Sequence, residues 1–118
     1  GANIEGKTAD SKWVSAVQNV AKNKNVYCKI SGLFQQSNRQ PSPKDVSFYQ
    51  SELDVLWSNF GADRLIYGSN WPVTMRGGTY AEYLNVVKSF FADKPHAAQE
   101  KYFYQNALKF YDLPSLKR

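Results

Sequence analysis

The fold is decided by residues 60–72, which read Phe60-Gly61-Ala62-Asp63-Arg64-Leu65-Ile66-Tyr67-Gly68-Ser69-Asn70-Trp71-Pro72. At their centre, Leu65–Gly68 is apolar on both faces, which is typical of a strand in a parallel sheet that helices cover. Pro72 has no backbone N–H to donate, so the strand must end before it. The stretch therefore predicts a short, fully buried strand that runs directly into a polar turn.

A second strand is predicted from Val26 to Ser31, because this run is rich in β-branched residues and is bounded by Gly32. Side chains alternate between the two faces of a strand. The first face carries Val26, Cys28 and Ile30, and the second carries Tyr27, Lys29 and Ser31. We expect the first face to meet the helices, together with Tyr67, and Cys28 to be an inert buried thiol.

Apolar residues at helical spacing predict four helices around these strands. They cover residues 11–23, 43–60, 79–91 and 97–111. Asp10 or Ser11 is the expected N-cap of the first helix, and Thr79 with Glu82 forms a capping box for the third. In the second helix, Pro43 suits the first turn and Gly61 the end. Residues 35–43 are expected to form a long polar connection.

The side chains expected to face inward lie on the apolar stripes of the last two helices. They are Tyr80, Tyr83, Leu84, Val87 and Phe91 in the third helix, and Tyr102, Phe103, Ala107, Phe110 and Leu113 in the fourth.

Helices that alternate with strands are the pattern of an α/β fold with parallel strands. Two strands alone would leave unpaired edges, which proteins avoid. The aromatic helix faces also call for a second layer; they carry Trp57, Phe60, Phe91, Phe103 and Phe110. Residues 1–118 are therefore expected to be a single partial domain. It would be completed by the rest of a larger sheet or by a second copy, in a symmetric dimer or closed ring.

Composition excludes several classes of function. The 118 residues carry 15 Lys plus Arg against 10 Asp plus Glu, a net charge of +5, but the lysines form no stripe and accompany no nucleic-acid-binding motif. No apolar run is long enough to cross a membrane. One Cys and one His allow no disulfide within the chain and no histidine metal site. We therefore expect no nucleic-acid or membrane partner, and His96 to be an exposed loop residue.

The start of the chain gives no cellular address. It begins with Gly1 rather than Met, so residues 1–2 are expected to be an expression remnant or a processing site. The localisation is left open, with the cytoplasm as the default.

Three segments together resemble the amidohydrolase-2 family. Residues 25–33 are similar to its penultimate strand, N-V-x-x-K-x-S-G, and residues 60–73 to its last strand, F-G-x-x-R-x-x-x-G-S-D-W-P. Residues 106–111 are similar to its closing helix, N-A-x-R-x-Y. The resemblance implies an α/β fold in which the chain is the C-terminal fragment of a TIM (β/α)8 barrel, comprising its last two parallel strands with flanking helices.

Barrel enzymes keep their chemistry at the carboxyl ends of strands, so the resemblance places a site at Asn70, Lys29, Ser31 and Trp71. Asn70 occupies the family's catalytic aspartate position, and an amide cannot accept a proton as a carboxylate does. Asn70 is alternatively a turn residue at the strand end. Lys29 would bind an anionic group of the substrate or pair with a carboxylate of the protein. Trp71 is expected to shape the rim rather than to react.

The resemblance implies a hydrolase that acts on a lactone or an amide-like small molecule, of which this segment alone is inactive. The alternative is a binding or assembly module that has lost catalysis, as Asn70 suggests. Whether the chain is part of an enzyme is left open. No cofactor is expected within these 118 residues, whereas the whole protein would use one divalent metal (zinc or manganese) or none.

Overall fold

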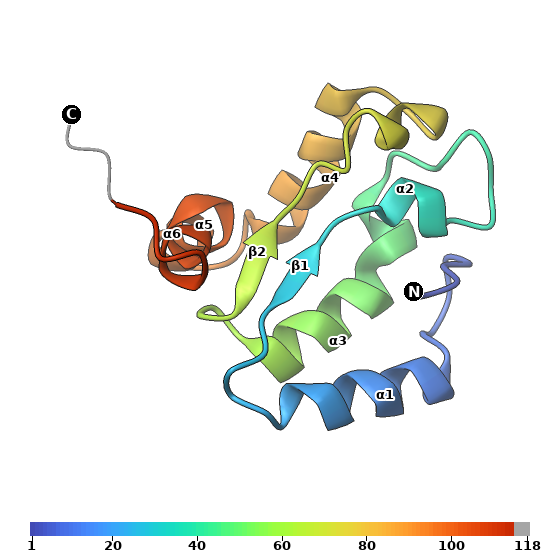
Figure 1. Cartoon of the computed structure of the whole chain (residues 1–118). Helices are drawn as coiled ribbons and strands as arrows, with labels where there is room; N and C mark the ends of the chain where they lie inside the picture. The colour runs from blue at the N-terminus through green and yellow to red at the C-terminus, as the bar shows by residue number, and fades with distance from the viewer. Residues whose placement is uncertain (115–118) are drawn as a thin grey trace.

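Two parallel strands lie at the centre of the computed structural model, which describes residues 1–114 (Figure 1). They are β1 (Cys28–Ile30) and β2 (Leu65–Tyr67). Cys28 pairs with Leu65, Lys29 with Ile66 and Ile30 with Tyr67. The predicted parallel pairing is confirmed, but β1 is shorter than predicted because only three of its residues have a partner in β2.

Helices pack beside this pair of strands, and Lys29 of β1 stays exposed. The helices are α1 (Ser11–Ala21), α2 (Leu33–Gln36), α3 (Gln50–Phe60), α4 (Tyr80–Phe91), α5 (His96–Glu100) and α6 (Asn106–Phe110). A 3-10 turn at Val46–Tyr49 leads into α3, another follows β2 at Val73–Arg76, and a π-helical turn at Lys101–Gln105 joins α5 to α6. None of the described helices is long and apolar enough to cross a lipid bilayer.

The predicted helix boundaries are largely confirmed. Asp10 accepts a hydrogen bond from the backbone N–H of Trp13 at 3.0 Å and caps α1. Thr79 and Glu82 form both bonds of the capping box at the start of α4. Gly61 ends α3 with a φ of 68°, a left-handed conformation that favours glycine.

Four sequence expectations are wrong. Pro43 precedes the second helix rather than lying in its first turn, because Asp45 accepts from Ser47 N–H at 2.8 Å and starts the helical turn at Val46. The polar connection contains the unexpected helix α2. The fourth helix is interrupted by the π-helical turn, and His96 begins α5 instead of lying in a loop.

Three residues expected to face inward are exposed in the described part of the chain: Tyr80 at 44%, Phe110 at 47% and Leu113 at 53%. The π-helical turn changes the helical phase, so Phe110 no longer follows the buried stripe of Tyr102, and Leu113 lies beyond the end of α6. Phe60 and Phe91, which were expected to need a second layer, are buried in the chain's own core.

The core lies between the strands and the helices and contains both aliphatic and aromatic side chains. The ring of Phe91 in α4 stacks on that of Tyr102 in the π-helical turn, with centroids 4.1 Å apart. The hydroxyls of Tyr83 and Tyr102 both donate to the backbone oxygen of Ile30, at 3.2 and 3.3 Å. Burial raises the pKa of both phenols, so they stay protonated as donors.

Asn106 attaches the closing helix to β2. Its side-chain nitrogen donates to the backbone oxygens of Ala62 at 2.8 Å and Leu65 at 2.9 Å, and the residue is buried. These bonds satisfy two carbonyls where the chain enters the strand. An asparagine is needed here because its amide supplies two donors.

Replacing Asn106→Ala should lower the free energy of unfolding by about 1–3 kcal/mol, because buried carbonyls would lose their donors. Urea unfolding followed by tryptophan fluorescence measures this loss. The control Asn85→Ala, at an exposed position of α4, should change stability by less than about 0.5 kcal/mol. Equal effects at both positions would contradict the role of Asn106.

Glu52 of α3 is a buried acid without a partner for one of its oxygens. The residue is 3% exposed, and its Oε2 has no hydrogen-bond partner among the described residues. Removal from water raises the pKa of the Glu52 carboxyl above its ordinary value of 4.5.

This shift predicts a pH-dependent effect of Glu52→Gln. The folded chain binds the Glu52 proton more tightly than the unfolded chain does. The free energy of unfolding therefore falls as the pH rises from 4.5, the ordinary pKa, through the raised pKa of the folded chain. Glu52→Gln should remove that fall, and its stability relative to the original chain should increase from pH 4 to pH 7. Urea unfolding at several pH values tests this, and parallel curves for the two proteins would contradict it.

Candidate functional site

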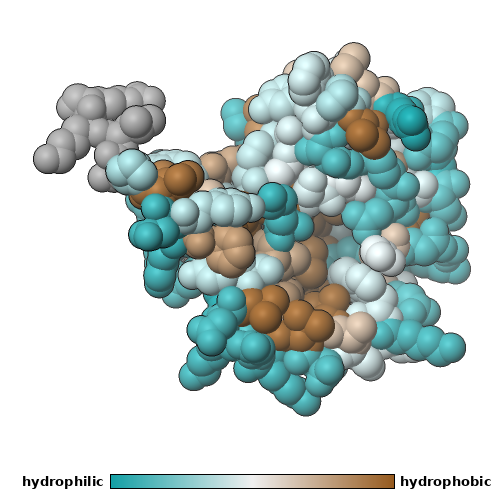
Figure 2. Space-filling view, viewed as in Figure 1, coloured by the Kyte–Doolittle hydropathy of each residue, from teal (hydrophilic) through white to brown (hydrophobic). Residues whose placement is uncertain are grey.

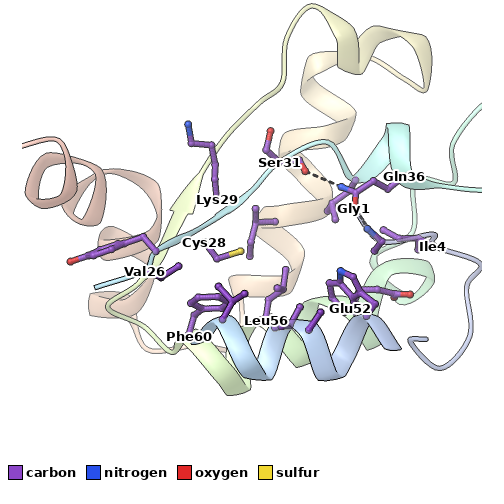
Figure 3. Close-up of a pocket in the computed structure, with 18 residues that line it drawn as sticks. Gly1, Ile4, Val26, Cys28, Lys29, Ser31, Gln36, Glu52, Leu56 and Phe60 are labelled. Carbon is purple, nitrogen blue, oxygen red and sulfur yellow. Dashed lines mark hydrogen bonds between the residues drawn. The ribbon is translucent and has the colours of Figure 1, made fainter. Parts of the chain in front are cut away.

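Lys29 and Ser31 extend from the face of β1 that points away from α1 and α3, whereas Cys28 points toward those helices (Figure 3). The predicted alternation is therefore confirmed. Desolvation raises the pKa of the half-buried Cys28 thiol to about 11, so it remains protonated and unreactive at neutral pH. Lys29 is exposed, and its Nζ lies 5.7 Å from the centre of the Tyr111 ring.

Gly68, directly after β2, makes room for these two side chains. A Cβ at Gly68 would lie 2.9 Å from both the Lys29 Cδ and the Ser31 Cβ, closer than real side chains come. The glycine is thus required by close packing, not by its backbone angles. It brings Lys29 and Ser31 against the end of β2.

Asn70 lies two residues further on, in a left-handed conformation with a φ of 53°. Asparagine tolerates this backbone better than most residues. Its Nδ2 donates to the Oε1 of Gln35 at 2.9 Å. The same nitrogen lies 3.3 Å from the point where a Cβ on Gly32 would stand, so the turns after the two strands are in close contact.

Gln35 is a site residue that the sequence does not predict, because its position falls in the expected polar connection. Its Nε2 donates to the backbone oxygen of Val73 at 2.8 Å while its Oε1 accepts from Asn70. One side chain in α2 therefore connects to two points of the segment after β2. Only the short helix α2, which no periodicity predicts, orients it for this role.

Trp71 is 61% exposed, and its backbone N–H donates to Ser69 Oγ at 3.1 Å. Lys29 and Ser31 thus both lie against Gly68 at the end of β2, and Asn70 is bonded to Gln35 of α2. Trp71 extends from the rim into solvent.

The two segments that follow the strands, residues 31–44 and 68–79, contain no aspartate or glutamate. They contain three cations, Arg39, Lys44 and Arg76. Lys44 Nζ donates to the backbone oxygens of Ser42 and Gly77 and so joins the two segments. With Lys29 on the adjoining strand, this rim favours negative charge on a bound molecule.

The described residues do not provide a metal site, because no three His, Cys, Asp or Glu side chains among residues 1–114 come together. His96 is the single histidine of the sequence. Its Nε2 lies 3.1 Å from Glu100 Oε1, one turn along α5, and does not adjoin the site residues.

Comparison with known proteins gives consistent matches over most of the chain. The family described as Amidohydrolase matches residues 1–113. An L-fucono-1,5-lactonase of Burkholderia multivorans is 30% identical over 110 residues, which cover 91% of this chain and 37% of the lactonase. An L-fucono-1,5-lactonase of Burkholderia ambifaria is 37% identical over 71 residues, 60% of this chain and 23% of that protein.

Solved structures show the same partial overlap. A crystal structure of an amidohydrolase from Burkholderia multivorans with bound Hepes matches with a TM-score of 0.82 and 28% identity, over 88% of this chain and 37% of that one. A second crystal structure from the same organism, with bound zinc, matches with a TM-score of 0.79 and 28% identity, over 88% and 38%. The chain therefore spans well under half of the relatives that it matches.

Proposed function

The chain belongs to the amidohydrolase family, and from this we propose that it is the C-terminal part of a (β/α)8-barrel hydrolase that acts on a lactone or an amide-like small molecule. Lactones enter the proposal because two of the relatives are lactonases. The chain covers 37% of the first of these, so the remaining strands of the barrel would come from outside these residues. Because a barrel site needs residues from several strands, we propose that this segment alone is inactive.

The proposal depends on one observation, the contact between the turns that follow β1 and β2. Asn70, Gln35 and Gly32 meet there, and Lys29 and Ser31 lie beside Gly68. In a barrel this end of the strands carries the reacting groups. Residues from two neighbouring strands thus adjoin where a substrate would bind.

Lys29 and Ser31 are proposed to bind the substrate through charge and hydrogen bonding. Attack of water on a lactone carbonyl places negative charge on oxygen and finally produces a carboxylate. A lysine ammonium and a rim without acidic side chains would stabilise this charge as it develops. Trp71 would cover the apolar part of the substrate from the rim.

Asn70 is proposed to orient water or the substrate carbonyl. Its amide can donate and accept hydrogen bonds, but it cannot take a proton near neutral pH. One N–H of this amide already bonds to Gln35, which leaves the second N–H and the oxygen for a ligand. A base for hydrolysis would therefore have to come from another part of the barrel.

Zinc does not fit the described residues, although one matching crystal structure contains it. At Asn70, where the sequence resemblance puts the family's aspartate, this chain has an amide, and no three acidic, histidine or cysteine side chains of the described residues come together there. No step of the proposed chemistry passes through a metal at this part of the site.

A non-catalytic binding or assembly module is the second candidate. The amide at Asn70 favours it, because loss of the carboxylate would remove proton transfer and leave the binding surface intact. Lys29 and the cationic rim would then retain an acidic small molecule without turning it over. The two candidates differ in what a restored carboxylate would do.

The 118-residue chain alone should hydrolyse sugar lactones no faster than buffer does, and it should bind zinc or manganese without a tight stoichiometric site. We expect this because the other barrel strands are not among these residues and because Asn70 has no carboxylate. A pH-indicator assay measures hydrolysis, with the Burkholderia multivorans lactonase as positive control, and calorimetry measures metal binding. Turnover that persists through repurification would contradict the proposal.

In the protein that carries the remaining strands, Asn70→Asp should raise lactonase activity by about 10²–10⁴-fold, the usual contribution of general acid–base catalysis. The control Asn38→Asp adds the same charge at an exposed position of the segment after β1 and should not raise activity. Steady-state kinetics on a lactone panel gives the ratio. If Asn70→Asp folds and binds but gains nothing, the binding module is the better description.

A further inference from the structure

The side chain of Gln35 forms two hydrogen bonds whose directions follow from the chemistry of its partners. Its Nε2 lies 2.8 Å from the backbone oxygen of Val73, and its Oε1 lies 2.9 Å from Asn70 Nδ2. A backbone carbonyl oxygen can only accept a hydrogen bond. The nitrogen of the Gln35 amide must therefore face Val73, which leaves its oxygen to face Asn70.

This order also fixes the amide of Asn70. The Gln35 oxygen can only accept, so the atom of Asn70 that meets it must be the nitrogen. Without such a partner an exposed amide turns over readily, because its terminal torsion has only a weak, two-fold preference. The Val73 carbonyl thus determines, through Gln35, that the oxygen of the Asn70 amide faces away from Gln35.

The acceptor that orients Gln35 belongs to the same turn as Asn70. The backbone N–H of Thr74 donates to the backbone oxygen of Asn70 at 2.9 Å, and Thr74 is fully buried. The helix α2, which carries Gln35, lies against the 3-10 turn that begins at Val73 (Figure 1). Gln35 therefore binds a turn that is closed on itself, and its two contacts could not both persist if its amide turned over.

Gly32 leaves room for the two amides. A Cβ at this position would lie 3.3 Å from Asn70 Nδ2 and 3.6 Å from Gln35 Oε1. The φ of Gly32 is 71°, in the left-handed region that favours glycine. The start of α2 thus allows Asn70 to approach Gln35 closely.

The pair of amides is accessible from solvent. Asn70 is exposed and Gln35 is half-buried. Figure 2 shows mainly hydrophilic and neutral side chains over the upper right of the view, where the segments after β1 and β2 lie, whereas hydrophobic side chains gather lower down. A bound molecule can therefore reach Asn70, so the orientation of its amide decides which groups that molecule meets.

We propose that Gln35 is a positioning residue, which holds the Asn70 amide with its nitrogen toward α2 and so requires a hydrogen-bond donor at position 70 rather than a carboxylate. An ionised aspartate there would place an acceptor against Gln35 Oε1 and could donate nothing to it. Gln35 could relieve this conflict only by giving up its bond to Val73. The inference rests on the proposed function, since it concerns the group that Asn70 presents to a substrate.

The carboxyl introduced by Asn70→Asp reports this contact directly. Its pKa should be higher by about 0.5–1 with Gln35 in place than in the double variant Asn70→Asp/Gln35→Met, because the opposing oxygen disfavours the charged form. Methionine has the same length as glutamine and lacks the amide. Carbon-13 NMR of the labelled carboxyl in the 118-residue chain measures both values.

The other charged groups near this turn are identical in the two variants, so they cancel in the comparison. They are the cations Lys29, Arg39, Lys44 and Arg76, and Glu82 at the start of α4, which packs against the same 3-10 turn. The matched control is the carboxyl of Asn38→Asp, at an exposed position after α2. Adding Gln35→Met should leave the pKa of this carboxyl unchanged.

A second measurement uses the side-chain amides of the unsubstituted chain. Hydrogen exchange of the Asn70 amide should be slower than that of Asn38 by about twofold or more, the effect of one exposed hydrogen bond. Gln35→Met should remove this difference. Backbone NMR signals verify that each variant is folded.

The proposal is overturned if the pKa is equal in the two Asn70→Asp variants or lower with Gln35 in place, since Gln35 would then not oppose the carboxylate. Equal exchange of the Asn70 and Asn38 amides would also overturn it. None of these measurements needs a substrate. A pKa shift without a gain in lactonase activity removes the proposed chemistry alone, and a gain without the shift removes the role of Gln35 alone.

Discussion

The backbone oxygen of Ile30 is the point on which the structure depends. It accepts hydrogen bonds from Gly68 N–H, from the Tyr83 hydroxyl and from the Tyr102 hydroxyl. These donors belong to the end of β2, to α4 and to the π-helical turn. A carbonyl has two lone pairs, so three donors converge on an acceptor that two would fill. One atom thereby fixes the sheet register and holds both later helical segments against it.

The candidate site follows from this fixed register. Because Ile30 holds Gly68, the neighbouring Lys29 and Ser31 lie against a glycine that cannot obstruct them. The chain then turns at Asn70, whose side chain meets Gln35 from the other segment. The site thus needs few specialised residues, since the register and a single glycine bring the two strand ends together.

Features with a local physical cause could be predicted from the sequence. Asp10, Thr79 and Glu82 cap helices through bonds within a few residues, and Gly61 ends a helix by its own backbone freedom. The faces of Lys29 and Cys28 follow from strand alternation. Features that depend on distant contacts could not be predicted. Gln35 gains its role only because α2 forms against the segment after β2, and Phe110 leaves the buried stripe because the π-helical turn changes the phase of its helix.

The charge of the two segments that follow the strands does not change near neutral pH. Residues 31–44 and 68–79 contain no Asp, Glu, His, Cys or Tyr, so none of their side chains is of a type that titrates near neutral pH. Their electrostatic potential therefore stays constant while a solution passes from mildly acidic to mildly alkaline. A ligand that exchanges a proton over this range would meet the same positive field before and after the exchange. Any acid–base sensitivity at this rim would then belong to the ligand or to neighbouring strands, not to these two segments.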